Sequence, residues 1–160
     1  MEVSITRRLL AAVAVPVLLG AAAAWGSTIP AVSGTLTDRP HRITGTAHAD
    51  HLTGTARPDL INGEGGNDVI RGLGGDDDLR GGEISGLDTL YGGPGNDVLR
   101  LVNGGRAYGG PGNDTIYAVY LFTRSVIDCG PGNDLLFLTD ETRQNVTIRG
   151  CEKIVTTPIN

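Results

Sequence analysis

Large apolar residues recur along the middle of the chain at a basic interval of nine positions, and an aspartate stands two positions before each of them. The stretches between these pairs are rich in glycine, asparagine and threonine, which favour turns. Side chains two positions apart share one face of a strand, so each unit predicts a tight turn followed by a short strand. The expected inward column consists of Leu52, Ile61, Ile70, Leu79, Leu90, Leu99, Ile116 and Leu136.

Three nine-residue units are nearly identical and begin at Gly92, Gly109 and Cys129. Each has a glycine-rich turn of six residues that ends in aspartate, followed by three residues typical of a strand. Four earlier units keep this frame with fewer glycines, and the unit Gly81–Tyr91 is two residues longer. Repetition at a fixed period predicts units that stack on one another to share a core.

These units resemble the RTX-type nonapeptide repeats, G-G-x-G-x-D-x-U-x, in which U is a large apolar residue. The resemblance covers roughly residues 45–137. It implies an all-β fold, a parallel β-roll (β-solenoid) in which two repeats form one coil and several calcium ions bind between successive turns. The tail, Asp128-Cys129 followed by Cys151-Glu152, also resembles exported actinobacterial proteins described as calcium-binding.

The resemblance further implies that sixth-position aspartates and turn carbonyls hold the metal. The candidate metal residues are Asp68, Asp77, Asp88, Asp97, Asp114, Asp134, Gly93, Gly95, Gly110, Gly112, Gly130, Gly132, Asn96, Asn113 and Asn133. Such groups suit calcium independently, because calcium takes about six to eight oxygen ligands in flexible geometry. The alternative is a metal-free β-solenoid in which asparagine and aspartate only form turns.

Alternate repeats should turn at opposite edges, which predicts two unequal sets of sites. One edge receives Asp59, Asp77, Asp97, Asp114 and Asp134, and the other receives Asp50, Asp68 and Asp88, followed by Gly105 and Ser125. We expect stronger sites from Asp77 to Asp134 and one site from Asp68 with Asp88. No strong site is assigned to Asp50 or Asp59, because Thr46 and Thr55 replace the second glycine of each turn and Arg57-Pro58 fills part of the latter turn.

Composition fits a fold that depends on ions. The chain has 160 residues, of which 25 are glycine, and only one Trp, four Tyr and two Phe, so a conventional apolar core would be small. A formal net charge of −5 argues against nucleic acid or anionic membranes as partners and favours cations. We expect a monomer with no stable membrane insertion after signal cleavage.

The N-terminal region has the order of a secretory signal. Arg7 and Arg8 precede an apolar stretch that ends in the alanines 21–24, which predicts a signal peptide over residues 1–24 and a secreted, extracellular protein. The alternative is an uncleaved membrane anchor, for which the stretch is short. Residues 25–44 are predicted to form a linker and cap, residues 45–137 the repeats, and residues 138–160 closing strands and a tail.

The two cysteines, Cys129 and Cys151, predict a disulfide in an oxidising compartment, and two free buried thiols are the alternative. No nucleophile-elbow or zinc-protease motif occurs, so we expect no enzyme. The sequence predicts an exported calcium-binding protein with folding coupled to calcium and a structural or interaction role. The alternative is an accessory module of an exported protease, lipase or epimerase system that lacks its catalytic domain.

Overall fold

The computed structural model describes residues 39–82, 86–140 and 145–158. Within these ranges the chain forms short strands joined by turns. The strands are β1 His41–Thr44, β2 His51–Thr53, β3 Asp59–Asn62, β4 Val69–Arg71, β5 Asp78–Arg80, β6 Asp88–Tyr91, β7 Val98–Val102, β8 Gly105–Tyr108, β9 Thr115–Val119, β10 Ser125–Asp128, β11 Leu135–Thr139, β12 Val146–Arg149 and β13 Lys153–Thr157.

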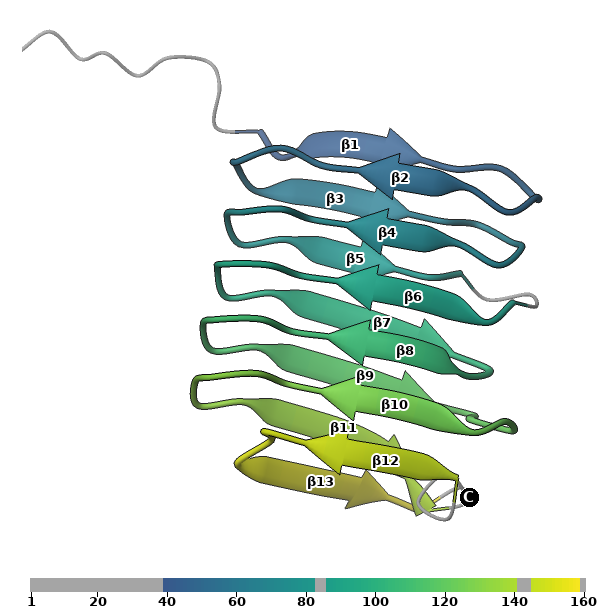
Figure 1. The fold of residues 1–160 in the computed structure, drawn as a ribbon, viewed down its shortest axis with the longest axis vertical. Helices are drawn as coiled ribbons and strands as arrows, with labels where there is room; N and C mark the ends of the chain where they lie inside the picture. The colour runs from purple at the N-terminus through teal and green to yellow at the C-terminus, as the bar shows by residue number, and fades with distance from the viewer. Residues whose placement is uncertain (1–38, 83–85, 141–144, 159–160) are drawn as a thin grey trace, which may run out of the picture. The chain divides into compact units, whose positions relative to one another are not determined.

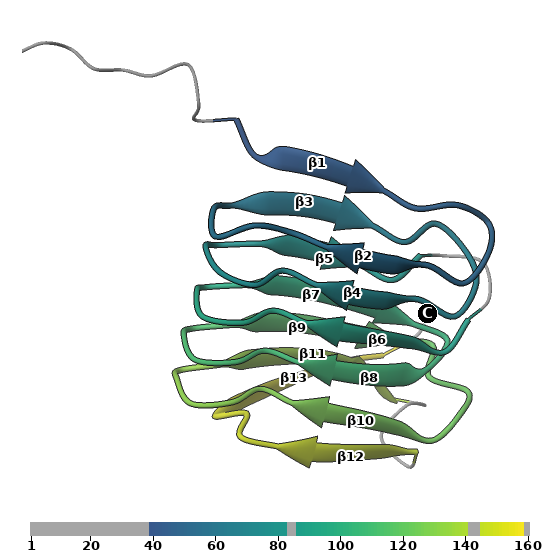
Figure 2. The ribbon, with the colours of Figure 1, turned by 45° about the horizontal axis from the view of Figure 1, so that its top comes forward.

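Odd and even strands form two separate parallel sheets. The first has the order β1-β3-β5-β7-β9-β11-β13, and the second has the order β12-β10-β8-β6-β4-β2. Each strand therefore pairs with the strand two places later in the chain, so two repeats complete one coil (Figures 1 and 2). The predicted all-β parallel β-roll is confirmed.

The core lies between the two sheets and follows the column expected from the nine-residue unit. Ile61, Ile70, Leu79, Leu90, Leu99, Ile116 and Leu136 have no exposed surface, whereas Leu52, in the first coil, is only partly buried. The longer strands β7, β9 and β11 add a second inward row of Leu101, Ala118 and Leu138. Each large apolar side chain contributes about 1.5–3 kcal/mol when it is fully buried.

Strands outside the clear repeats extend both ends of this stack. β1 lies in the segment 25–44 assigned to linker and cap, and it pairs with β3. β12 and β13 occupy the region predicted to close the roll, and they pair with β10 and β11. The predicted signal peptide, residues 1–24, lies outside the described residues. The described part of the chain has no helix with the length and apolarity that a membrane crossing requires.

Candidate functional site

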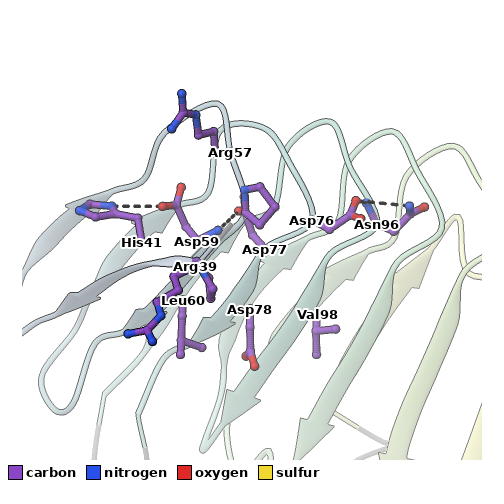
Figure 3. Close-up of a pocket in the computed structure, with 12 residues that line it drawn as sticks. Arg39, His41, Arg57, Asp59, Leu60, Asp76, Asp77, Asp78, Asn96 and Val98 are labelled. Carbon is purple, nitrogen blue, oxygen red and sulfur yellow. Dashed lines mark hydrogen bonds and ion pairs between the residues drawn. The ribbon is translucent and has the colours of Figure 1, made fainter. Parts of the chain in front are cut away.

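Aspartates gather in one row along one edge of the roll, where the turns lead into the first sheet. This long carboxylate column consists of Asp59, Asp77, Asp97, Asp114 and Asp134, and Glu152 extends it in the last coil. The backbone N–H of each member donates to one carboxylate oxygen of the next member, over 2.7–2.8 Å. Figure 3 shows the first step, from Asp59 to Asp77.

The opposite edge has a short carboxylate column of Asp50, Asp68 and Asp88. The N–H of Asp50 donates to Asp68, and the N–H of Asp68 donates to Asp88, over 2.9 and 3.0 Å. In the next coil Gly105 pairs with Asp88, and Ser125 begins β10 one coil further on. The unequal distribution of aspartates that the repeat frame predicts is therefore present in the fold.

One oxygen of most column aspartates has no partner. The Oδ1 atoms accept the ladder hydrogen bonds, whereas the Oδ2 atoms of Asp68, Asp77, Asp97, Asp114 and Asp134 are buried without a hydrogen bond. These five side chains belong to residues that are 1–2 % exposed. Because a buried polar atom without a partner is costly, these oxygens favour a positively charged ligand beside them.

The burial also changes the acidity of these groups. Loss of water raises the pKa of Asp97 to about 7, and neighbouring carboxylates add to the rise while the N–H of Asp77 opposes it. The same cause raises the pKa values of Asp77, Asp88 and Asp114 to about 6. Without a cation, these carboxylates therefore bind protons at a higher pH than exposed aspartates do.

The glycine at the first position of a turn lies directly beside the unpartnered carboxylate oxygen of that turn. A Cβ added to Gly92 would lie 2.5 Å from the carbonyl oxygen of Gly109 and closer still to Oδ2 of Asp97. Gly109 has the same relation to Asp114 Oδ2 and to the carbonyl of Cys129. At both of these turns a carboxylate oxygen and a backbone carbonyl of the following coil thus converge on one small space.

The other predicted turn residues lie beside these aspartates. Gly93, Gly95, Gly110, Gly112 and Gly130 have positive φ, which lets the turn reverse without a side-chain clash. The carbonyl of Gly112 faces Gly132 in the next coil. Asn96, Asn113 and Asn133 form a separate exposed ladder, in which the N–H of Asn113 donates to Asn96 and the N–H of Asn133 donates to Asn113.

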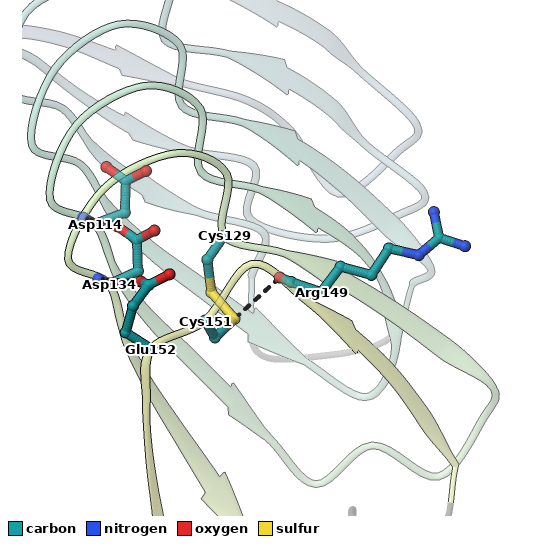
Figure 4. Close-up of a disulfide and its surroundings, with 6 residues drawn as sticks. All are labelled: Asp114, Cys129, Asp134, Arg149, Cys151 and Glu152. Atoms are coloured by element: carbon teal, nitrogen blue, oxygen red, sulfur yellow. Dashed lines mark hydrogen bonds between the residues drawn. A yellow bond between two sulfur atoms is a disulfide. The ribbon is translucent and has the colours of Figure 1, made fainter.

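The C-terminal coil closes the long carboxylate column with different groups (Figure 4). The N–H of Asp134 donates to Oε2 of Glu152 over 2.8 Å, so glutamate takes the aspartate position. Cys129 and Cys151 are joined by a disulfide, with their Cα atoms 5.2 Å apart. Glu152 is absent from the metal residues predicted from the sequence, although an acidic residue two positions before Ile154 repeats the spacing of the earlier repeats.

Comparison with known families identifies the repeats. The family model described as RTX calcium-binding nonapeptide repeat matches residues 44–83, 85–105 and 106–118. The chain carries RTX calcium-binding nonapeptide repeats. No curated protein and no solved structure gave a match.

The residues present fit the calcium that RTX repeats bind. Calcium prefers carboxylate and carbonyl oxygens, and these are the groups that converge beside Gly92 and Gly109, where the carboxylate oxygen has no hydrogen bond. In the described part of the chain, no three His, Cys, Asp or Glu side chains form a metal cluster by themselves. An ion bound by these RTX turns would therefore need backbone carbonyls together with the aspartates.

The disulfide gives a first prediction about the stability of the RTX roll. Reduction of Cys129–Cys151, which are separated by 22 positions, should lower the free energy of unfolding by about 3 kcal/mol, because it frees the unfolded chain. Denaturant unfolding in saturating calcium, with and without reductant, measures the change. A variant with both cysteines replaced by serine should match the reduced protein and should not respond to reductant. Equal stability of the oxidised and reduced proteins would contradict the prediction.

Proposed function

We propose that this chain is an exported protein that binds several calcium ions in its β-roll, folds in a calcium-coupled manner and has a structural or interaction role. The observation that supports this proposal most directly is that buried carboxylate oxygens have no partner at Asp77, Asp97, Asp114 and Asp134 on the long carboxylate column and at Asp68 on the short one. A divalent cation supplies the positive charge that those oxygens lack. The Cys129–Cys151 disulfide supports export, because such bonds persist in oxidising compartments.

The proposed sites follow the two columns. On the long carboxylate column, the pairs Asp77–Asp97, Asp97–Asp114 and Asp114–Asp134 supply carboxylates, and the neighbouring glycine and asparagine turns supply carbonyls. On the short carboxylate column, Asp68 and Asp88 supply the carboxylates of one further site. Beyond Asp88 this column continues with Gly105 and Ser125, which carry no charge, so we expect fewer ions on that edge.

Calcium binding and folding should be coupled because the folded roll without calcium carries an electrostatic cost. Stacking buried aspartates at the spacing of parallel strands brings like charges together and removes water from them. The apolar core offsets this only in part, because most coils contribute two large buried side chains. A cation that joins adjacent turns removes the repulsion only in the folded roll, so binding stabilises the folded state.

Titration of the calcium-free chain with calcium tests this proposal. Far-ultraviolet circular dichroism should show a cooperative gain of β-structure, and calorimetry should show more than one ion bound per chain. Magnesium at the same concentrations is the control, and it should be much less effective because it demands a stricter octahedral geometry. A chain that is equally ordered in calcium and in excess chelator, with no heat of binding, would contradict the proposal.

A further inference from the structure

The turns of the first two repeats differ at their second position from the turns of the six later repeats that end in aspartate. Thr46 and Thr55 stand where the clearest repeats have glycine, and neither has positive φ. In these six later repeats the second position has positive φ whatever the residue. Those residues are Glu64, Leu73, Gly82, Gly93, Gly110 and Gly130.

The different backbone direction gives the aspartates of the first two turns hydrogen-bond donors from their own turns. The N–H of Thr55 donates to Oδ2 of Asp59 over 2.6 Å, and its hydroxyl donates to the same oxygen over 3.1 Å. Thr46 makes the same two bonds to Oδ2 of Asp50, over 2.6 and 2.9 Å. The N–H of Gly93, in a later turn, instead donates to the carbonyl of Gly109.

The threonine oxygens are themselves used within this arrangement. The hydroxyl of Thr55 accepts the N–H of Arg57, and that of Thr46 accepts the N–H of His48. The carbonyl oxygens of the two threonines accept the N–H groups of Gly74 and Gly65 in the next coil. Each of these turns therefore satisfies its carboxylate and already employs the second-position carbonyl in a hydrogen bond.

At five of the later turns the Oδ2 atom of the aspartate has no hydrogen-bond partner, unlike Oδ2 of Asp50 and Asp59. Oδ2 of Asp97 and Oδ2 of Asp59 occupy equivalent places in two residues that are almost equally buried, at 1 % and 2 % exposure. The first has no hydrogen bond, whereas the second has two donors. Asp59 also has His41 at 3.2 Å from its other carboxylate oxygen (Figure 3).

We propose that Thr46 and Thr55 replace calcium at the first two turns, so that the Asp50 and Asp59 carboxylates are held by protein donors and take no ion. This inference rests on the proposed function, because it divides the turns of a calcium-binding roll into two kinds. The first coil then forms an ion-independent end, and calcium binding begins at the turns that end in Asp68 and Asp77. The second residue of the turn supplies the donors that distinguish the first two turns.

Two matched substitutions in the long carboxylate column test the division. Asp97→Asn should lower the number of calcium ions bound per chain by at least one, as counted by calorimetry and equilibrium dialysis. Asp59→Asn removes the same charge from an equally buried position and should leave that number unchanged. A folded Asp59→Asn protein that binds fewer ions than the wild type would overturn the inference. If the wild type bound no calcium, the proposed function itself would fail, which is a different result.

A direct view of the ions covers the case in which Asp59→Asn does not fold. Crystals of the wild-type chain loaded with a lanthanide should show anomalous peaks at the later turns and none bonded to the carboxylate of Asp50 or Asp59. A peak within bonding distance of either carboxylate would overturn the inference. Peaks at the later turns alone support it without reference to any variant.

Discussion

Replacement of Gly92 by alanine should weaken calcium binding and lower the stability of the roll. The new Cβ would occupy the space shared by Asp97 Oδ2 and the carbonyl oxygen of Gly109, where the backbone cannot move without separating two coils. Overpacking of this kind costs about 1–3 kcal/mol, and the lost ion adds to it. We expect calcium affinity to fall at least about tenfold, which corresponds to about 1.4 kcal/mol, together with a lower melting temperature in calcium.

Gly74→Ala is the matched control for this substitution. Neither Gly74 nor Gly92 has positive φ, so alanine causes no backbone strain at either position. A Cβ on Gly74 would have Pro94 O as its nearest neighbour, at 3.7 Å, which is an ordinary contact. The free energy of unfolding of the Gly74→Ala variant should differ from that of the wild type by less than about 0.5 kcal/mol. Equal effects of the two variants, measured by calorimetric melting and calcium titration, would show that the space above Gly92 has no special role.

Acidification should partly replace calcium in the metal-free chain. Burial raises the pKa of Asp97 to about 7 and the pKa values of Asp77, Asp88 and Asp114 to about 6, against 3.8 for an ordinary aspartate. Protonation therefore favours the folded state: the stabilisation is complete below about pH 4 and is lost as the pH rises through 6 to 7. Since a tenfold change in proton affinity equals about 1.4 kcal/mol, four such groups give a large combined effect.

The measurement is circular dichroism of the chelator-treated chain between pH 7.5 and pH 5. We expect β-structure and the melting temperature to increase as the pH falls. Saturating calcium provides the control, because protons then compete with the ion for the same oxygens and acidification should lower the melting temperature. If the melting temperature changed with pH in the same direction with and without calcium, the assignment of buried, unpartnered carboxylates would be contradicted. A metal-free chain whose melting temperature did not change over this pH range would contradict it as well.

Much of the fold can be predicted from the sequence because the repeat has a local physical cause. An aspartate two positions before a large apolar residue fixes which side chain faces inward, and the glycine-rich turn fixes where the strand begins. Every member of the predicted inward column except Leu52 is fully buried. Counting alternate repeats also predicted the two edges, including the place of Gly105 opposite Asp88. These features depend only on period, and period is visible in a linear chain.

The hydrogen-bond partner of each carboxylate oxygen depends on tertiary structure. Glu64 and Leu73 adopt positive φ, with values of 72° and 83°, at the turn position where glycine stands in the later repeats, although their side chains disfavour it. Thr55 does not have positive φ at this position, and its N–H donates a hydrogen bond to Oδ2 of Asp59.

The amino-acid sequence by itself determined the repeat, the inward column and the two unequal rows of aspartates, since all three follow from spacing. Only the tertiary structure decided which of those aspartates keep an unpartnered oxygen, and that Glu152 completes the long carboxylate column. The physical reason is that a hydrogen bond depends on the direction of individual peptide groups. That direction is set where coils from distant parts of the chain meet.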